Sequence, residues 1–176
     1  MSYGDQAKPF GLSQVKFVSL TTPAVLVALE ASQVLEYTPR LLTGELEGSG
    51  KIVAVHSEIK ALDWKITEGG LPIAALNIMM GFTAVESGST PTRTTTTTFH
   101  TGVPFPDFMI YGKALNEAGG DMHVKIFKAK LTSPPSGGFK NGEFQVTEIS
   151  GSAVEDAVLG LWQWIENETA TALPVS

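Results

Sequence analysis

The chain has 176 residues, of which 43% are hydrophobic and 17% are charged, and its formal net charge at pH 7 is −6. This length fits one domain with a sizeable core, and an acidic chain with no basic stripe is unlike a protein that grips nucleic acid. Cysteine is absent, which excludes disulfides, thiolate metal sites and cysteine nucleophiles. No apolar run approaches the roughly 20 residues of a membrane span, and the first residues lack the features of a signal peptide. We therefore expect a soluble protein, made in the cytoplasm, with no membrane partner.

The first part of the chain favours extended structure. Residues 1–12 contain Gly4, Pro9 and Gly11 with little periodicity, which predicts an N-terminal arm. Strands are predicted at 13–20 and 24–31, and the second is almost continuously apolar, so we expect cover on both of its faces. Residues 32–50 show no clean period and indicate a long excursion with some extended structure, closed by a Gly-Ser-Gly turn.

Residues 40–81 form the most informative stretch. They predict a strand, a glycine-rich turn, two further strands and one short helix at about 71–80. Pro72 near the start of that helix and Gly81 after it are typical of helix termini. The helix is apolar on nearly every side, so most of its surface needs cover. Just before it, apolar and polar residues alternate from Leu62 to Thr67, which is typical of a strand with one buried face.

The second half of the chain predicts further strands. The threonine-rich stretch 84–101 favours an exposed edge strand or hairpin over helix, with low-complexity disorder as the alternative. Two strands at 107–115 and 122–131 are separated by a glycine turn, and a slip in the apolar phase of the second suits a β-bulge. Further along we expect a loop at 133–138, a tight turn at Asn141-Gly142, a strand at 143–150, and an apolar segment at 159–165 that is either a strand or a short helix.

Together these patterns predict a mainly β protein with an antiparallel β-sandwich or barrel over residues 13–152. One short helix flanks it, and extended arms are expected at 1–12 and 153–176. The last arm contains Trp162 and Trp164, which suggests docking on this subunit's own core or on a neighbour.

Residue patterns for catalysis or for cofactor binding are weak. The run Gly44 to Lys51 lacks the first glycine of a phosphate-binding loop, and Ile52 stands where a Ser or Thr should follow. The three histidines share no metal-like spacing. Glu45 and Glu47 fall on one face of an extended segment, where a solvated acidic face is the simpler interpretation than paired catalytic carboxylates. We expect no enzyme activity, no metal and no cofactor.

The stretch 40–81 also shows a family likeness. The Gly-Glu-Leu-x-Gly turn at 44–48, the strand with Trp64, the Glu-Gly-Gly-Leu-Pro run at 68–72 and the helix ending in Met80-Gly81 resemble the major tail tube proteins of long-tailed bacteriophages. This resemblance implies a β-sandwich with one flanking helix that assembles into stacked six-membered rings. Its partners would be itself, the tail-tip initiator and the tail terminator, and the tape measure protein and phage DNA would pass through the lumen without specific binding. It would be located in the virion tail, after assembly in the host cytoplasm.

Site predictions follow from that resemblance. An acidic lumen would repel DNA and leave it free to slide, so acidic residues of the stretch are candidates for the channel wall, with ordinary solvated strand residues as the alternative. The candidate lumen residues are Glu45, Glu47, Glu58, Asp63 and Glu68, and the candidate contacts between rings are Pro9, Phe10, Leu41, Leu42, Trp162 and Trp164.

Three other classes stay open on the sequence alone. The tube protein of a contractile tail or a related secretion system would share the fold and differ by a sheath partner. A carbohydrate-binding virion β-sandwich would need an exposed row of aromatic residues, and a lipocalin-type barrel would fit the central apolar helix poorly.

Overall fold

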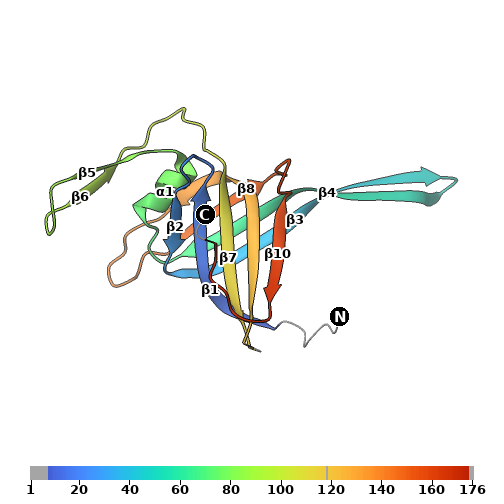
Figure 1. Cartoon of the computed structure of the whole chain (residues 1–176). Coiled ribbons are helices and arrows are strands. Elements are labelled where there is room, and N and C mark those ends of the chain that lie inside the picture. The colour runs from blue at the N-terminus through green and yellow to red at the C-terminus, as the bar shows by residue number, and fades with distance from the viewer. Residues whose placement is uncertain (1–7, 118, 175–176) are drawn as a thin grey trace.

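A computed structural model describes residues 8–117 and 119–174 of the chain. Within these residues the protein is mainly β, with antiparallel pairing throughout and one short helix, as predicted (Figure 1). The elements in chain order are β1 (Pro9–Ser19), β2 (Leu26–Leu29), β3 (Ser32–Gly48), β4 (Lys51–Glu68), α1 (Ile73–Met80), β5 (Ala84–Ser87), β6 (Thr94–Thr97), β7 (Phe108–Asn116), β8 (Asp121–Ser136), β9 (Thr147–Ala153) and β10 (Trp162–Asn167).

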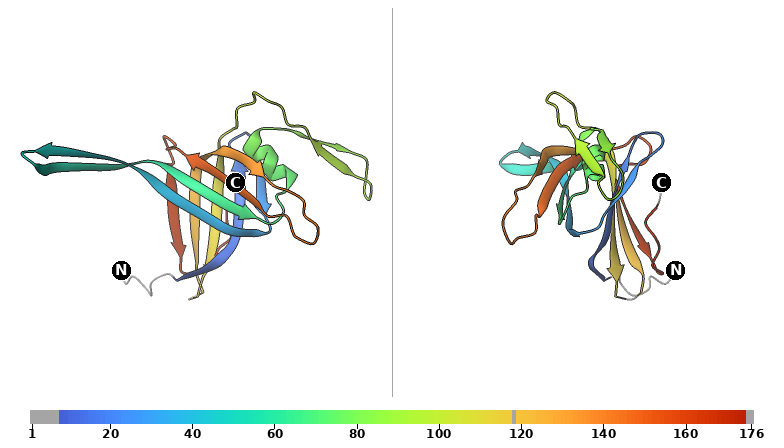
Figure 2. Two further views of the ribbon diagram at one scale, coloured as in Figure 1. Left: turned by 180° about the vertical axis from the view of Figure 1, so that it is seen from behind. Right: turned by 90° about the vertical axis from the view of Figure 1, so that its left-hand side faces the viewer.

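One long sheet makes both layers of the fold. Its strands follow the order β2-β1-β7-β8-β9-β4-β3, and β10 also pairs with β8. The first part of β8 lies beside β7 and β10, and its last part, from Ala129, lies beside β9. Between Ile126 and Ala129 the register against β7 shifts, which confirms the predicted bulge. The sheet therefore turns at β8, and its two halves face each other (Figure 2).

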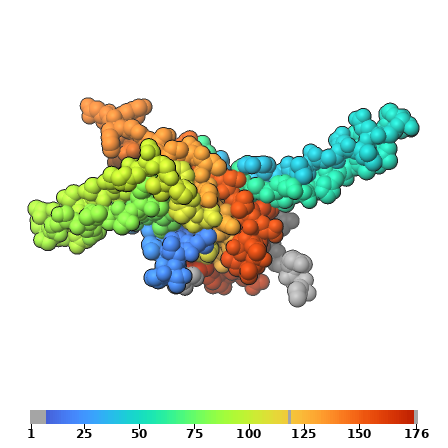
Figure 3. Space-filling model, turned by 90° about the horizontal axis from the view of Figure 1, so that it is seen from above, coloured from blue at the N-terminus to red at the C-terminus, as the bar shows by residue number. Residues whose placement is uncertain are grey.

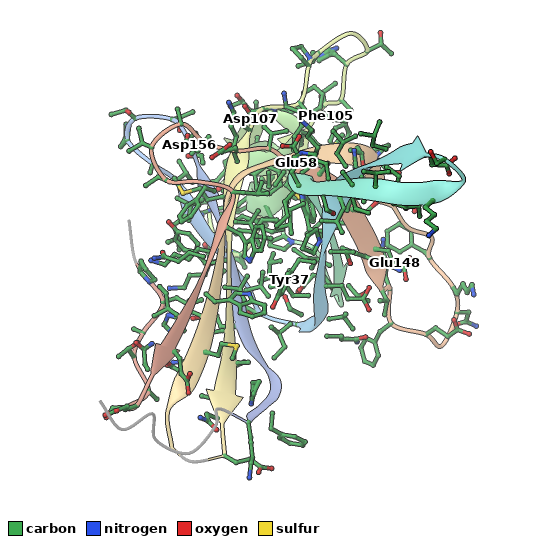
Figure 4. The ribbon with its side chains drawn as sticks, turned by 90° about the vertical axis from the view of Figure 1, so that its right-hand side faces the viewer. Tyr37, Glu58, Phe105, Asp107, Glu148 and Asp156 are labelled. Atoms are coloured by element: carbon green, nitrogen blue, oxygen red, sulfur yellow. The ribbon has the colours of Figure 1, made fainter. Side chains whose placement is uncertain are left out.

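The hydrophobic core lies between these two layers (Figure 4). The inward-pointing side chains include Phe17 of β1 and Ile66 of β4, and in β4 the buried positions alternate with partly exposed ones from Leu62 to Glu68. Phe108 joins the layers, because its ring packs edge-on against Phe17 at 5.2 Å and against Trp64 at 5.7 Å between centroids. Trp64 is only 2% exposed, as the alternation from Leu62 to Thr67 predicts.

The helix α1 closes one end of the core (Figure 2). It begins after Pro72 and ends at Gly81, whose φ of 75° is a left-handed conformation that suits glycine. Ala75, Ile78 and Met79 are buried, while the other helix residues are partly covered or exposed. The predicted helix is confirmed: it ends at Met80 as expected and begins at Ile73, two residues after the predicted start.

Several predicted boundaries are wrong. Residues 51–68 form the single strand β4 where two strands were expected, and β8 continues through the predicted loop as far as Ser136. β2 is shorter than predicted and only partly covered, because it lies at the edge of the sheet. β9 begins at Thr147, so residues 143–146 belong to a loop.

The structure also differs from the prediction of two extended arms, for those arm residues that it describes. Residues 9–12 belong to β1 and pair with β7, while residues 1–7 lie outside the described residues. At the other end, β10 pairs with β8, and Leu173 is buried against Val18 and Tyr111. The C-terminal segment therefore covers this subunit's own sheet, because both its backbone and its apolar side chains find partners there.

Candidate assembly surfaces

A long hairpin is the most prominent surface feature. β3 and β4 extend together beyond the body of the protein over residues 41–59 (Figure 1, right; Figure 3). They are joined by a two-residue turn in which Ser49 and Gly50 both have positive φ, at 54° and 76°, a geometry that matches the twist of a hairpin. The large apolar side chains exposed on this hairpin are Leu41, Leu42, Leu46, Ile52, Val53, Val55 and Ile59.

These apolar side chains occupy both faces of the hairpin. Leu41 lies opposite Ile59 on one face, and Leu42 and Leu46 lie on the other. A two-stranded ribbon is marginally stable in water by itself, and contiguous exposed apolar surface of this kind marks an interaction site. Leu41 and Leu42 are both exposed and so are accessible to a neighbouring ring. Their contact with that ring stays a prediction.

The candidate lumen acids do not share one face. Glu45 lies opposite Val55, whereas Glu58 lies opposite Leu42, three residues away along β3, so the two carboxylates point to opposite faces. Glu58 is paired with Lys60 at 2.6 Å, and Asp63 is paired with Arg40. The hydrogen bond from Arg40 is the main cause that lowers the pKa of Asp63. Glu45 and Glu47 make no salt bridge within the described residues.

The prediction for Glu68 is wrong. Its side chain is fully buried, at 0% exposure. The carboxylate accepts a hydrogen bond of 2.9 Å from the backbone N–H of Ala31 and another from the hydroxyl of Ser32. Glu68 therefore fastens the start of β3 to the end of β4 and cannot line a channel.

The remaining candidate contact residues differ in exposure. Phe10 is 77% exposed at the start of β1, next to Pro9, which is also exposed. Trp164 is 61% exposed and packs edge-on against Tyr37. Trp162 is partly buried against the main core, which leaves it little free surface. Of the two tryptophans, only Trp164 can offer a neighbour a large apolar face.

A buried polar cluster holds the C-terminal segment, and sequence patterns did not predict it. Asp121, fully buried at the start of β8, lies 2.9 Å from Lys113 Nζ and 3.2 Å from His123 Nε2. It also accepts hydrogen bonds of 2.6 Å from the Asn167 side chain and from the backbone N–H of Thr171. Burial alone would raise the pKa of Asp121, but the hydrogen bonds from Asn167 and the Thr171 backbone, together with the nearby Lys113 ammonium, outweigh it and hold the pKa far below its usual value.

The surface also contains an open groove of about 720 Å³. One wall is the side of α1 that contains Ala74, Asn77 and Ile78, and the opposite wall is the turn between β1 and β2. Apolar side chains make up much of its lining, and Asp107 is the titratable residue among the described residues that line it. The carboxylate of Asp107 is paired with Lys130 at 3.2 Å.

The other chemistry considered from the sequence finds no support. Residues 44–51 form the end of the β3–β4 hairpin, so they are not a loop between a strand and a helix. Among the described residues, no group of three or more His, Asp or Glu could hold a metal ion, and no helix is long and apolar enough to cross a membrane.

Comparisons with known proteins do not assign the chain to a family. No protein-family model matches it, and no curated protein matches its sequence.

Proposed function

We propose that this chain is a structural virion protein that assembles into stacked hexameric rings and so forms the tail tube of a long-tailed bacteriophage. The observation that carries the proposal is the β3–β4 hairpin, whose exposed apolar side chains lie on both faces. Such a ribbon gains stability when another subunit covers it. The resemblance of residues 40–81 to tail tube proteins points to the same role.

The unpaired edges of the sheet give a second argument for assembly into rings. β2 and β3 end the strand order, and β10 pairs only with β8 among the described strands, so each leaves a row of backbone groups free to pair. A ring of identical subunits uses two different surfaces that meet head to tail. Pairing of these edges between neighbours would close a continuous barrel around a lumen.

The proposed tube is a conduit for DNA ejection, located in the virion tail. It would be started by a tail-tip initiator and closed by a terminator, and the tape measure protein and DNA would pass through without specific binding. Glu45 and Glu47 are the better candidates for the lumen, because neither is neutralised by an ion pair within the described part of the chain. Unpaired carboxylates repel DNA phosphates more than paired ones.

Electron microscopy of the purified protein, negatively stained over a range of concentrations and salt, tests the proposal. Rings or hollow tubes with six-fold end views are the expected result. Because a subunit of this kind can wait for an initiator, preparations with tail-tip complexes are included. Particles that stay monomeric even with these complexes would contradict the proposed function.

The tube protein of a contractile tail or secretion system is the nearest alternative, and co-purification of a sheath protein on the tube would favour it. A carbohydrate-binding role receives less support. It needs a row of exposed aromatic rings, but Trp64 is buried in the core and Trp162 packs against it.

A further inference from the structure

Two phenylalanine side chains on one loop are almost fully exposed to solvent. Residues 137–146 connect β8 to β9, and within them Phe139 is 94% exposed and Phe144 is 99% exposed. The turn between them includes Gly142 at φ 80°, and Lys140 and Glu143 form an exposed ion pair at 3.5 Å. Aromatic rings that are this exposed gain nothing in the free subunit, whereas each can bury roughly 150–250 Å² in a contact.

The loop does not place these rings in a hollow of its own subunit. The nearest hollow is lined by Leu76 and Met80 of α1 together with Gly137 and Gln145 at the two ends of the loop, but neither phenylalanine lines it. Both rings therefore need a surface on another molecule if they are to be covered.

The groove beside α1 has the properties that such a surface needs. Its volume of about 720 Å³ is open to solvent, and Leu20, Val25 and Ile78 contribute apolar lining. Asp107 also lines it and is paired with Lys130. The loop thus presents the pair Lys140 and Glu143, and the groove presents Asp107 with its partner Lys130 beside the lining. The two ion pairs can exchange partners when the surfaces meet.

Loop and groove lie on opposite sides of the molecule. Figure 2 (right) shows the loop between β8 and β9 projecting to one side and the β1–β2 turn, which forms a wall of the groove, to the other. The view in Figure 3 shows the same separation, with the orange loop and the blue turn on opposite edges. A projection on one side and a matching hollow on the other make a head-to-tail contact, the kind that generates rings.

We propose that Phe139 and Phe144 of one subunit insert into the groove beside α1 of a second copy of this chain. This inference rests on the proposed function and names the contact between ring neighbours. Two buried rings supply about 300–500 Å², roughly half of the 800 Å² per partner in a stable interface. Paired strand edges supply the rest.

Disulfide cross-linking tests the contact directly, because the native chain has no cysteine. Gly138→Cys places a thiol beside Phe139, where a Cβ meets open space, and Thr83→Cys places one in the groove. Mixed assemblies of the two variants should give a dimer-sized product on oxidation. The matched control replaces Thr83→Cys by Val158→Cys, which is also exposed, at 90%, but lies outside the groove.

The outcomes separate this inference from the proposed function. A product from the Gly138→Cys and Thr83→Cys mixture, formed only in assemblies and absent with Val158→Cys, supports the contact. Rings or tubes that form without this product overturn it and leave the tube proposal standing. If the wild-type chain never assembles, even with initiator, both fall together.

A second pair of variants measures the same contact without cysteines. Phe139→Ser with Phe144→Ser should leave the folded subunit unchanged, because both side chains are already in solvent. Loss of two buried rings should raise the concentration needed for assembly by at least about tenfold. Val158→Ser is the control and should assemble as the wild type does, and equal assembly of the double variant would contradict the inference.

Discussion

At the scale of single residues, Asp121 shows how much of the structure depends on one buried charge. Its carboxylate faces Lys113 and His123 on the same sheet and receives hydrogen bonds from Asn167 and from the backbone of Thr171. Because its pKa is lowered in the folded protein, its stabilisation is present in full above the unfolded pKa near 3.9. It is lost as pH falls through the folded value, so acid should release the C-terminal segment.

Asp121→Asn should lower the free energy of unfolding at pH 7 by about 3 kcal/mol, because it leaves Lys113 as a nearly buried charge without its carboxylate. It should also flatten the loss of stability below pH 4. Chemical denaturation at pH 7 and pH 3, with hydrogen exchange at Thr171, measures both effects. Glu86→Gln is the control, since its exposed pair with Arg93 contributes only about 0–1 kcal/mol. A variant with unchanged pH dependence would show that Asp121 does not hold the segment.

At the scale of elements, substitutions in the β3–β4 hairpin should affect assembly while leaving the folding of the free subunit nearly unchanged. The hairpin's side chains beyond Leu41 project away from the core, so the free subunit does not depend on them. Leu46→Ser and Val55→Ser, which alter opposite faces of the ribbon, should each change the unfolding free energy by at most about 0.5 kcal/mol. Each should nevertheless raise the concentration needed for tube formation.

Sedimentation of assembled material across a concentration series measures this effect, and thermal unfolding of the free subunit checks that folding is intact. If only one of the two variants weakens assembly, a single face of the hairpin is covered in the tube. Normal assembly of both variants would remove the hairpin as the main support for the proposed function.

At the scale of the whole molecule, a close approach at Gly151 fixes the position of Trp64, the side chain that reaches the opposite layer. Gly151 of β9 lies directly under the Trp64 side chain, and a Cβ at this position would overlap both the indole ring and the carbonyl oxygen of Lys130. Because Trp64 in turn contacts Phe108 in the other layer, a shift here is transmitted across the core.

Gly151→Ala should therefore destabilise the subunit by about 1–3 kcal/mol, the usual range for overpacking a core. Gly138→Ala is the matched control, because its Cβ meets open space and its backbone needs no positive φ, and it should be neutral or slightly stabilising. Urea denaturation of both variants measures the difference. Equal stability of the two would show that β9 can move away from Trp64 without cost.

Much of the local structure could be predicted from the sequence. Alternation from Leu62 to Thr67 placed the buried face of β4, and Pro72 and Gly81 bounded the helix, because these signals depend on neighbouring residues alone. The phase slip after Ile126 likewise indicated the bulge that lets β8 serve both layers. The mainly β fold with one helix follows from such patterns.

Only the tertiary structure decided which of these residues face solvent and which meet. In the sequence Glu68 is an ordinary strand carboxylate, but the fold buries it and gives it hydrogen bonds to the start of β3. Asp121 and Thr171 are 50 residues apart, and the exposure of Phe139 and Phe144 on either side of the predicted turn at Asn141-Gly142 is likewise visible only in the folded chain. Burial and pairing of this kind depend on contacts between distant segments, whereas periodicity and turn chemistry are local properties of the chain.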